Sequence, residues 1–210
     1  LASRRAAEAG IRIGFSVTTN GTALTSGDLD LLRAHPFAVT VSLDGDAETH
    51  DRHRRRHDGT GTFAAILEKL APLLASPGKA KIAARATVAR DDLRVNDRIE
   101  ALTALDFHEA GVSPVRTGPN PDLALRTEDW PIFLAEMIAA AEAEWRRVAE
   151  GGEPRFANLW SAVKQIHRGS ARPLPCGSAI SYVSLSADGG YFTCHRTIDD
   201  RRFALGTVAT

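Results

Sequence analysis

Two short polar motifs near the start of the chain carry residue types that could bind a small polar molecule. Residues 18–22 read Thr-Thr-Asn-Gly-Thr, residues 41–45 read Val-Ser-Leu-Asp-Gly, and each motif ends a short apolar run. Because strand side chains alternate, the Ser42 hydroxyl and the Asp44 carboxylate fall on one face, where they could bind a ribose or an amino group. Asn-Gly and Asp-Gly are also common turn dipeptides, so a solvated strand end remains the alternative.

A basic segment follows the second motif. Residues 50–57 read His-Asp-Arg-His-Arg-Arg-Arg-His, and such a run usually forms a solvated basic face. Arginine is nevertheless the residue best suited to bind a carboxylate through two parallel hydrogen bonds. Residues 58–62 read Asp-Gly-Thr-Gly-Thr before an expected helix, and their N–H groups could face an anion. The loop lacks the Walker lysine and the Rossmann glycine spacing, which favours an ordinary helix cap.

The chain has two cysteines, both near its end. Cys176 and Cys194 are eighteen positions apart, and a hairpin expected between them would bring them near each other. Two thiols cannot complete a tetrahedral metal site, and no histidine pair lies at a convincing ligand spacing. Two free structural cysteines are therefore the alternative to a metal-binding role.

The overall composition is that of an ordinary globular protein. The 210 residues are 43% hydrophobic and 25% charged, and a chain of this length can bury a real core. Lys+Arg and Asp+Glu balance at 26 each, which argues against nucleic acid or an anionic membrane as a partner. No apolar run approaches the roughly 18–20 residues of a membrane helix. So few cysteines argue against a disulfide framework, and the expected location is the reducing cytoplasm.

Alternating strands and helices are expected to position the two polar motifs. The expected strands cover residues 11–18, 38–44, 81–88 and 112–115, with helices between them. This alternation predicts βαβ crossovers and a parallel sheet, whose carboxyl-terminal edge is the usual place for ligands. Four units are too few for a closed barrel, and a helix expected over residues 3–9 suggests that the chain is the middle of something larger.

The second half of the chain changes pattern. Thr127 is expected to cap a long helix, and a second helix is expected over residues 157–167. Beyond Cys176, strands at 180–185 and 191–194 are expected to form a hairpin around a turn at 188–190. The apolar side chains of the long helix form one stripe, which we interpret as core: Trp130, Phe133, Leu134, Met137, Ile138, Ala141, Trp145 and Val148.

Taken in order, these motifs resemble those of radical S-adenosylmethionine (AdoMet) enzymes that carry a SPASM domain. The resemblance rests on the motifs at 18–22 and 41–45, on His-Asp-x-x-Arg at 50–54 and on Gly-Thr-Phe at 61–63. The tail resembles the start of the SPASM domain, whose pattern is Cys, nine to fifteen residues, Gly, four residues, Cys. Here twelve residues separate Cys176 from Gly189, and four separate Gly189 from Cys194. Cys176-Gly177, Asp188-Gly189, Cys194-His195-Arg196 and residues 203–208 complete the match.

The resemblance implies a fold and a set of ligands. The fold would be α/β: a partial (β/α)6 TIM-like barrel over residues 1–125, a helical connection over 126–172 and the start of a SPASM β-hairpin module over 173–210. Ser42 would contact the ribose region of AdoMet and Arg54 its carboxylate, while Asn20 and Asp44 would shape the same pocket. Cys176 and Cys194 would ligate an auxiliary 4Fe–4S cluster.

The chain also departs from the family pattern. The Cys-x-x-x-Cys-x-x-Cys loop that holds the radical-generating 4Fe–4S cluster is absent, as are the later SPASM cysteines. We therefore expect a fragment that cannot cleave AdoMet by itself. Gly-Gly-Glu-Pro at 151–154 matches the family's motif for the methionyl amino group, but it follows a helix late in the chain, and we interpret it as a coincidence.

The residue after the second SPASM cysteine separates two enzyme hypotheses. Sulfatase maturases carry an Asp there as a base, whereas this chain has His195, as in peptide maturases that install thioether or carbon–carbon crosslinks. His195 could accept a proton, since an unperturbed histidine titrates near neutrality, or it could be structural. The leading hypothesis is a radical peptide maturase that abstracts hydrogen from a ribosomal peptide residue to form a thioether or carbon–carbon crosslink. The alternatives are a sulfatase maturase and a catalytically dead scaffold that binds a leader peptide.

Overall fold

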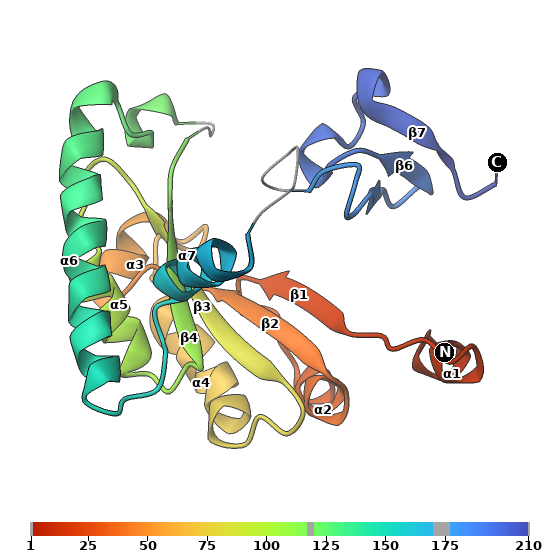
Figure 1. Ribbon diagram of the computed structural model, residues 1–210, viewed down its shortest axis with the longest axis horizontal. Helices are drawn as coiled ribbons and strands as arrows, with labels where there is room; N and C mark the ends of the chain where they lie inside the picture. Colours follow the sequence, from red (N-terminus) through yellow and green to blue (C-terminus); the bar gives the residue numbers. More distant parts are fainter. Residues whose placement is uncertain (1, 117–119, 170–176, 210) are drawn as a thin grey trace. The chain divides into compact units, whose positions relative to one another are not determined.

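The computed structural model describes residues 2–116, 120–169 and 177–209, which form two compact units (Figure 1). The first unit covers residues 1–162 and the second covers residues 163–210, with the boundary inside a helix. The three-part division expected from the sequence, with boundaries at 125 and 172, stays a prediction. None of the helices in these described ranges has the length and apolarity needed to cross a membrane.

A four-stranded parallel sheet forms the centre of the first unit. Its strands lie in the order β1-β2-β3-β4, so each strand pairs with the next along the chain. This arrangement confirms the predicted α/β fold with βαβ crossovers. The strands are β1 (Phe15–Thr19), β2 (Phe37–Ser42), β3 (Lys81–Val88) and β4 (Glu109–Pro114).

Helices connect the strands along the sequence as expected, with one addition. The unexpected element is α3 (Ala47–His53), which forms within the segment interpreted as a basic face. Asp46 explains this helix, because its side chain accepts a hydrogen bond from the Thr49 N–H and so caps the first turn. The other helices of this unit are α1 (Ala2–Glu8), α2 (Ser26–Ala34), α4 (Phe63–Ala75), α5 (Asn96–Thr103), α6 (Trp130–Ala149) and the start of α7 (Ala157–Arg168), with 3-10 turns η1 (Pro121–Leu123) and η2 (Thr127–Asp129).

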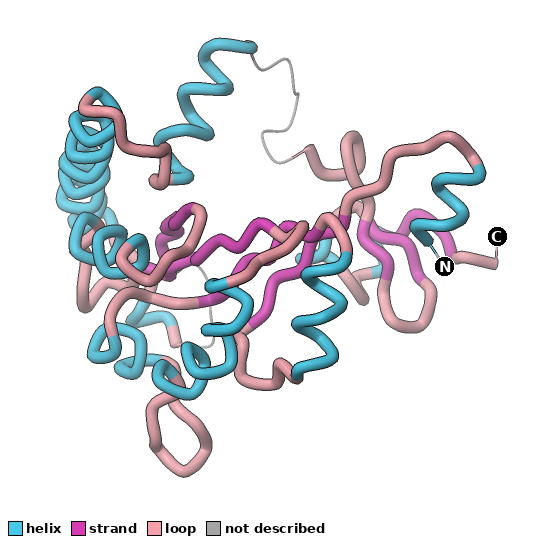
Figure 2. The backbone as a smooth tube through the Cα atoms, turned by 90° about the horizontal axis from the view of Figure 1, so that it is seen from below, coloured by secondary structure: helices cyan, strands magenta, loops and turns pink. Residues whose placement is uncertain are grey.

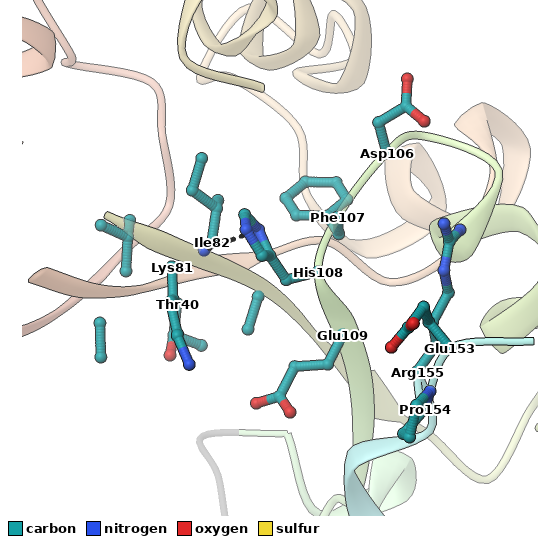
Figure 3. Close-up of a pocket in the computed structure, with 13 residues that line it drawn as sticks. Thr40, Lys81, Ile82, Asp106, Phe107, His108, Glu109, Glu153, Pro154 and Arg155 are labelled. Atoms are coloured by element: carbon teal, nitrogen blue, oxygen red, sulfur yellow. Dashed lines mark hydrogen bonds between the residues drawn. The ribbon is translucent and has the colours of Figure 1, made fainter. Parts of the chain in front are cut away.

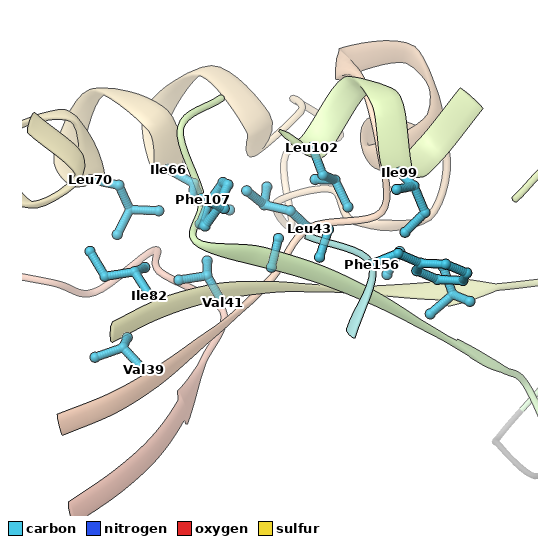
Figure 4. Close-up of a cluster of buried hydrophobic side chains, with 14 of the residues drawn as sticks. Val39, Val41, Leu43, Ile66, Leu70, Ile82, Ile99, Leu102, Phe107 and Phe156 are labelled. Carbon is cyan, nitrogen blue, oxygen red and sulfur yellow. The ribbon is translucent and has the colours of Figure 1, made fainter. Parts of the chain in front are cut away.

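One face of the sheet carries the hydrophobic core. Alternate residues of β2 and β3, including Val39, Val41 and Ile82, are at most 1% exposed and pack against side chains of the helices (Figure 4). Several helices gather on one side of the sheet, as the view in Figure 2 shows. Since side chains alternate along a strand, the residues between them form an opposite face that is polar. It includes Thr40 and Ser42 of β2 and Arg85 and Thr87 of β3, all exposed or half-buried.

The outer edge of β4 is covered by the segment that leads into α7. The Ala110 N–H donates to the Arg155 carbonyl at 2.9 Å, and the Asn158 side-chain amide bonds both backbone groups of Val112. Glu144 of α6 fixes this segment, because its carboxylate accepts from the N–H groups of Arg155 and Phe156. The edge strand therefore has its backbone groups satisfied, which limits pairing with other chains.

The interpretation of the whole α6 stripe as core is wrong. Phe133 and Ala140 are buried, but Trp130, Leu134, Ile138 and Trp145 are 40–59% exposed. The helix packs on α5 along a narrow strip, and Trp145 stacks on Trp160 of α7 with ring centroids 6.0 Å apart. The stripe is therefore only partly covered within the described part of the chain. Thr127 is not the cap either, because it lies in η2 and α6 begins at Trp130.

The second unit is a small antiparallel sheet. Its strands are β5 (Ser184–Leu185), β6 (Gly190–Phe192) and β7 (Ala204–Thr207), with 3-10 turns η3 (His195–Thr197) and η4 (Arg201–Phe203). The predicted hairpin is confirmed, with shorter strands than expected and a third strand added. Of its described residues, Gly177, Ser186 and Phe192 are buried, and β7 is exposed along its length.

Candidate ligand site at the carboxyl ends of the strands

The four residues predicted to bind AdoMet lie near the carboxyl ends of β1 and β2. Asn20 follows the last residue of β1, Ser42 is the last residue of β2, and Asp44 comes two residues later. Arg54 lies directly after α3, as its C-cap. Asn20 and Arg54 line one cavity of about 410 Å³, which Thr62 and other side chains also border. The structure therefore places all four predicted residues around one edge of the sheet, which we call the rim.

Asp44 and Arg54 form a close ion pair at this rim. Arg54 Nε donates to Asp44 Oδ2 at 2.6 Å, and Arg54 Nη2 donates to Asp44 Oδ1 at 3.1 Å. The Thr87 N–H donates to the same carboxylate at 2.8 Å, and the Thr87 hydroxyl accepts from Arg54 Nη2 at 3.3 Å. Asp44 is 4% exposed, so the pair is shielded from water on the carboxylate side. The bidentate geometry fixes the plane of the Arg54 guanidinium without any ligand.

A buried histidine, His50, holds the backbone on both sides of the Asp44–Arg54 pair. The Asp44 N–H donates to His50 Nδ1 at 3.3 Å, so the ring proton belongs on Nε2, which lies 3.0 Å from the Thr62 hydroxyl. That hydroxyl in turn donates to the Arg54 carbonyl at 2.8 Å. Burial of the ring lowers the pKa of His50, which favours the neutral form that this bonding requires. These hydrogen bonds therefore connect the backbone of Asp44 and the backbone of Arg54 to one imidazole.

A second buried arginine holds the backbone of Asp44. Arg98 Nη1 donates to the Asp44 carbonyl at 2.5 Å, and Arg98 Nη2 lies 3.4 Å from Asp92 Oδ2. The hydrogen bonds from Arg94 are the first cause that lowers the pKa of Asp92 to about 2. Burial lowers the pKa of the Arg98 guanidinium, while Asp92 and Asp44 oppose that shift. Asp92 therefore remains ionised and balances the buried cation.

The glycine-rich loop at 58–62 has a structural role. Asp51 Oδ1 accepts from the N–H groups of Thr62 and Phe63 at 2.8 and 2.9 Å, and so caps α4 from the neighbouring helix. A Cβ at Gly61 would lie 2.0 Å from Asp51 Oδ2, which explains the glycine at this position. The expectation of an ordinary helix cap is confirmed, although the capping group comes from α3 instead of the loop threonines.

Sequence reasoning missed the roles of His50, Thr62 and Arg98 at this site. His50 was interpreted as part of a solvated basic run, yet it is fully buried. A signal was present in Asp46, whose capping position predicts a helix that turns His50 inward. Arg98 carried no comparable signal, because the Asp44 carbonyl to which it donates lies 54 residues away along the chain.

In the second unit, Cys194 is the predicted cluster ligand that can be placed, because Cys176 lies outside the described residues. Cys194 Sγ lies 3.5 Å from the Tyr182 hydroxyl and 3.8 Å from His195 Nδ1. The hydrogen bond with Tyr182, followed by the backbone N–H of Arg196, lowers the pKa of the thiol. Thiolate is the form that ligates iron, so this environment fits a cluster ligand. Among the described residues, no three potential metal ligands come together.

The Gly-Gly-Glu-Pro segment lies far from the rim. Glu153 and Pro154 line a cavity of about 680 Å³ at the amino-terminal ends of β2, β3 and β4, together with Lys81 and Glu109 (Figure 3). His108 accepts a hydrogen bond from the Ile82 N–H at 3.3 Å in the same region. Since the segment is at the opposite end of the strands from Asn20 and Ser42, it shares no surface with the predicted pocket. This placement agrees with the interpretation of the motif as a coincidence.

Comparisons with known sequences match short parts of the chain. No protein-family model matches it. An uncharacterized protein of Synechocystis is 38% identical over 52 residues, which is 25% of this chain and 13% of that protein. A cysteine-type anaerobic sulfatase-maturating enzyme of Clostridium novyi is 32% identical over 60 residues, which is 29% of this chain and 16% of the enzyme.

Comparison with solved structures covers nearly the whole chain. The anaerobic sulfatase-maturating enzyme anSMEcpe, with bound AdoMet and the Kp18Cys peptide, matches 97% of this chain with a TM-score of 0.79 at 20% identity. This chain has the fold of that enzyme. Streptococcus suis SuiB bound to AdoMet matches 91% of the chain with a TM-score of 0.61 at 9% identity. The chain spans 57% of the anSMEcpe chain and 45% of the SuiB chain, about half of each. The predicted barrel-plus-hairpin fold is confirmed.

Proposed function

We propose that the protein containing this chain is a radical AdoMet maturase that binds AdoMet at the rim of the first unit. The observation that carries the proposal is the Asp44–Arg54 pair, which is ordered at the carboxyl ends of parallel strands in the fold of AdoMet-bound enzymes. Ser42 contacts the ribose region and Arg54 the carboxylate, while Asn20 and Asp44 shape the pocket. Arg54 Nη1 makes no hydrogen bond within the described residues, so the N–H groups of this nitrogen remain for a ligand.

The proposed cofactors include 4Fe–4S clusters. Cys194, together with Cys176, holds an auxiliary cluster, and the lowered pKa of the Cys194 thiol supports this role. The radical-generating cluster needs three further cysteines, and the 210 residues contain two cysteines in all. That cluster supplies the electron that cleaves AdoMet to a 5′-deoxyadenosyl radical, which abstracts hydrogen from the substrate.

The proposed substrate is a residue in a ribosomal peptide or protein. The anSMEcpe structure with the Kp18Cys peptide supports a peptide as the substrate class. His195 at the position of the sulfatase-maturase base favours crosslink formation over sulfatase maturation, and it lies exposed beside Cys194. Maturation of a sulfatase is the second candidate, supported by the match to the Clostridium novyi enzyme. A catalytically dead scaffold that binds a leader peptide is the non-catalytic alternative. For an active enzyme, a leader-peptide-binding domain is a further possible partner.

Reconstitution and AdoMet binding test the proposal in the full-length protein. Anaerobic treatment with iron and sulfide is expected to give bound iron with sulfide-to-iron charge-transfer absorbance, and Cys194→Ser is expected to lower the iron content. Calorimetry is expected to show AdoMet binding that Ser42→Ala weakens about tenfold or less, the effect of one hydrogen bond. The Ser42 hydroxyl has no hydrogen bond among the described residues, so this variant should unfold like the wild type.

Thr40→Val is the matched control, because Thr40 lies two residues earlier on the same face of β2. It should leave AdoMet affinity unchanged. A full-length protein that binds neither iron nor AdoMet would contradict the enzyme hypothesis and favour the scaffold.

A further inference from the structure

Arg85 occupies a central position on the polar face of the sheet. In the parallel register, Arg85 of β3 lies beside Ser42 of β2 and Gly111 of β4. Ser42 is the residue proposed to contact AdoMet, and adjacent strands are about 4.8 Å apart. Arg85 is therefore one strand away from the proposed ligand, on the face that looks away from the core.

The guanidinium of Arg85 is held in one orientation. Arg85 Nε and Nη2 both donate to the Ser113 hydroxyl, at 3.1 and 2.6 Å. Gly111 provides the space that this orientation needs, since a Cβ there would lie 3.2 Å from Arg85 Nη1 and 3.2 Å from Asn158 Oδ1. The side chain thus lies across β4 with its Nη1 edge free of hydrogen bonds within the described residues.

Arg85 differs from the arginines around it in its charge balance. Arg54 pairs with Asp44 at 2.6 Å, Arg98 with Asp92 at 3.4 Å and Arg90 with Asp129 at 2.9 Å. Arg85 makes no ion pair with a described carboxylate, and its partner Ser113 is a neutral hydroxyl. The acids near it on this face are Asp44, which is already paired with Arg54, and Glu109, two residues before Gly111 on β4; Arg85 makes an ion pair with neither. The fold therefore positions the Arg85 guanidinium without a described carboxylate to pair with it.

We propose that Arg85 binds a carboxylate of a ligand on this face, a role that rests on the proposed function. Two ligands could supply the carboxylate: the methionyl group of AdoMet, which Arg85 would then share with Arg54, or an acidic residue of the peptide substrate. Arginine suits either, because its planar fork matches a carboxylate with two hydrogen bonds. Ser113 is a positioning residue, since it fixes the edge of the guanidinium that points away from the ligand.

The test uses the full-length protein and two kinds of probe. Calorimetry compares AdoMet with decarboxylated AdoMet. A peptide array presents acidic peptides, each beside a counterpart in which Asp→Asn and Glu→Gln replacements remove the carboxylates. The variants are Arg85→Met, which removes the charge, and Ser113→Ala, which keeps the charge and releases the side chain. Lys81→Met is the control, because it removes a cation from the same face of β3 at the other end of the strand.

Arg85→Met is expected to weaken binding of the carboxylate-bearing probe about 10- to 100-fold, the effect of losing a hydrogen-bonded charge. Ser113→Ala should weaken it less, and Lys81→Met should have no effect. Loss of affinity for AdoMet but not for decarboxylated AdoMet assigns the carboxylate to AdoMet. Loss of affinity for the acidic peptides alone assigns it to the substrate.

Unchanged binding of both probes by Arg85→Met would overturn the inference. If the wild type binds no AdoMet, the proposed function fails separately, and the peptide array decides the role of Arg85. Since the Arg85 side chain is exposed, its replacement should not unfold the protein, and circular dichroism of each variant checks this.

Discussion

The rim of the first unit and the hairpin of the second unit are built in opposite ways. At the rim, Asp44, His50 and Thr62 are buried, and each side chain has a hydrogen-bond partner within the protein. Across the described residues, no buried side-chain nitrogen or oxygen lacks a partner. In the hairpin, by contrast, the buried residues among those described are two small ones and Phe192, and large apolar side chains such as Leu205 are exposed.

This difference shows which interactions stabilise each part. The rim is fixed by ion pairs and hydrogen bonds that need no ligand, so it is preorganised for binding. The described residues of the second unit bury little apolar surface, and small modules of this kind commonly depend on a metal or a disulfide. The proposed cluster ligands at Cys176 and Cys194 would supply that stability, because metal binding adds its free energy to folding.

The largest expected effect comes from removing the carboxylate at the centre of the rim. Asp44→Ala leaves the half-buried Arg54 without its partner, and the loss of one member of a buried pair costs about 3–5 kcal/mol of unfolding free energy. Urea unfolding followed by tryptophan fluorescence measures this change. Asp30→Ala is the matched control, because Asp30 pairs with Arg33 on the surface, and it should cost at most about 1 kcal/mol. Equal effects of the two substitutions would show that the rim is not held by this pair.

A smaller effect is expected from pH, through His50. Burial lowers the pKa of His50 in the folded protein below its unfolded value of about 6.5. Between these two values the unfolded chain binds more protons than the folded chain, so the free energy of unfolding rises with pH. The His50 contribution is therefore fully present above the unfolded pKa and is lost as the pH falls through the folded pKa.

Unfolding free energies measured from pH 8 down to pH 5 should show this decline in the wild type. In His50→Gln, the decline across the same range should be shallower. Exposed His57 provides the control, and His57→Gln should retain the wild-type slope. If the unfolding free energy of the wild type did not change across this pH range, a buried neutral His50 would not contribute to the stability of the rim.

The sequence predicted the parts of the fold that follow from local patterns. The parallel sheet could be predicted because apolar runs alternate with amphipathic helices, and β3 was placed at its observed limits, Lys81 and Val88. The rim residues Asn20, Ser42 and Asp44 could be proposed because strand ends in a parallel sheet converge. These inferences depend on periods of two and 3.6 residues, which a sequence displays directly.

The remaining features depend on contacts between distant residues. The hydrogen bond from Arg98 to the Asp44 carbonyl joins positions that are 54 residues apart, and no local sequence pattern predicts it. The prediction that the whole α6 stripe is core was wrong for a related reason. The periodicity of the helix shows an apolar face, but it does not show what covers that face. Leu134 is 59% exposed, while its neighbour Phe133 is buried against the core.

The smallest expected effect is in the hairpin. Leu185 of β5 is 54% exposed, so Leu185→Ala should change stability by no more than about 0.5 kcal/mol. Amide hydrogen exchange across residues 180–208 measures this local stability, whereas global unfolding would report mainly the first unit. Phe192→Ala is the comparison within the same sheet, because Phe192 is 9% exposed, and it should abolish protection throughout the hairpin. Strong loss of protection in Leu185→Ala would mean that the hairpin is packed against other parts of the protein, and that apolar contacts stabilise it as they stabilise the first unit.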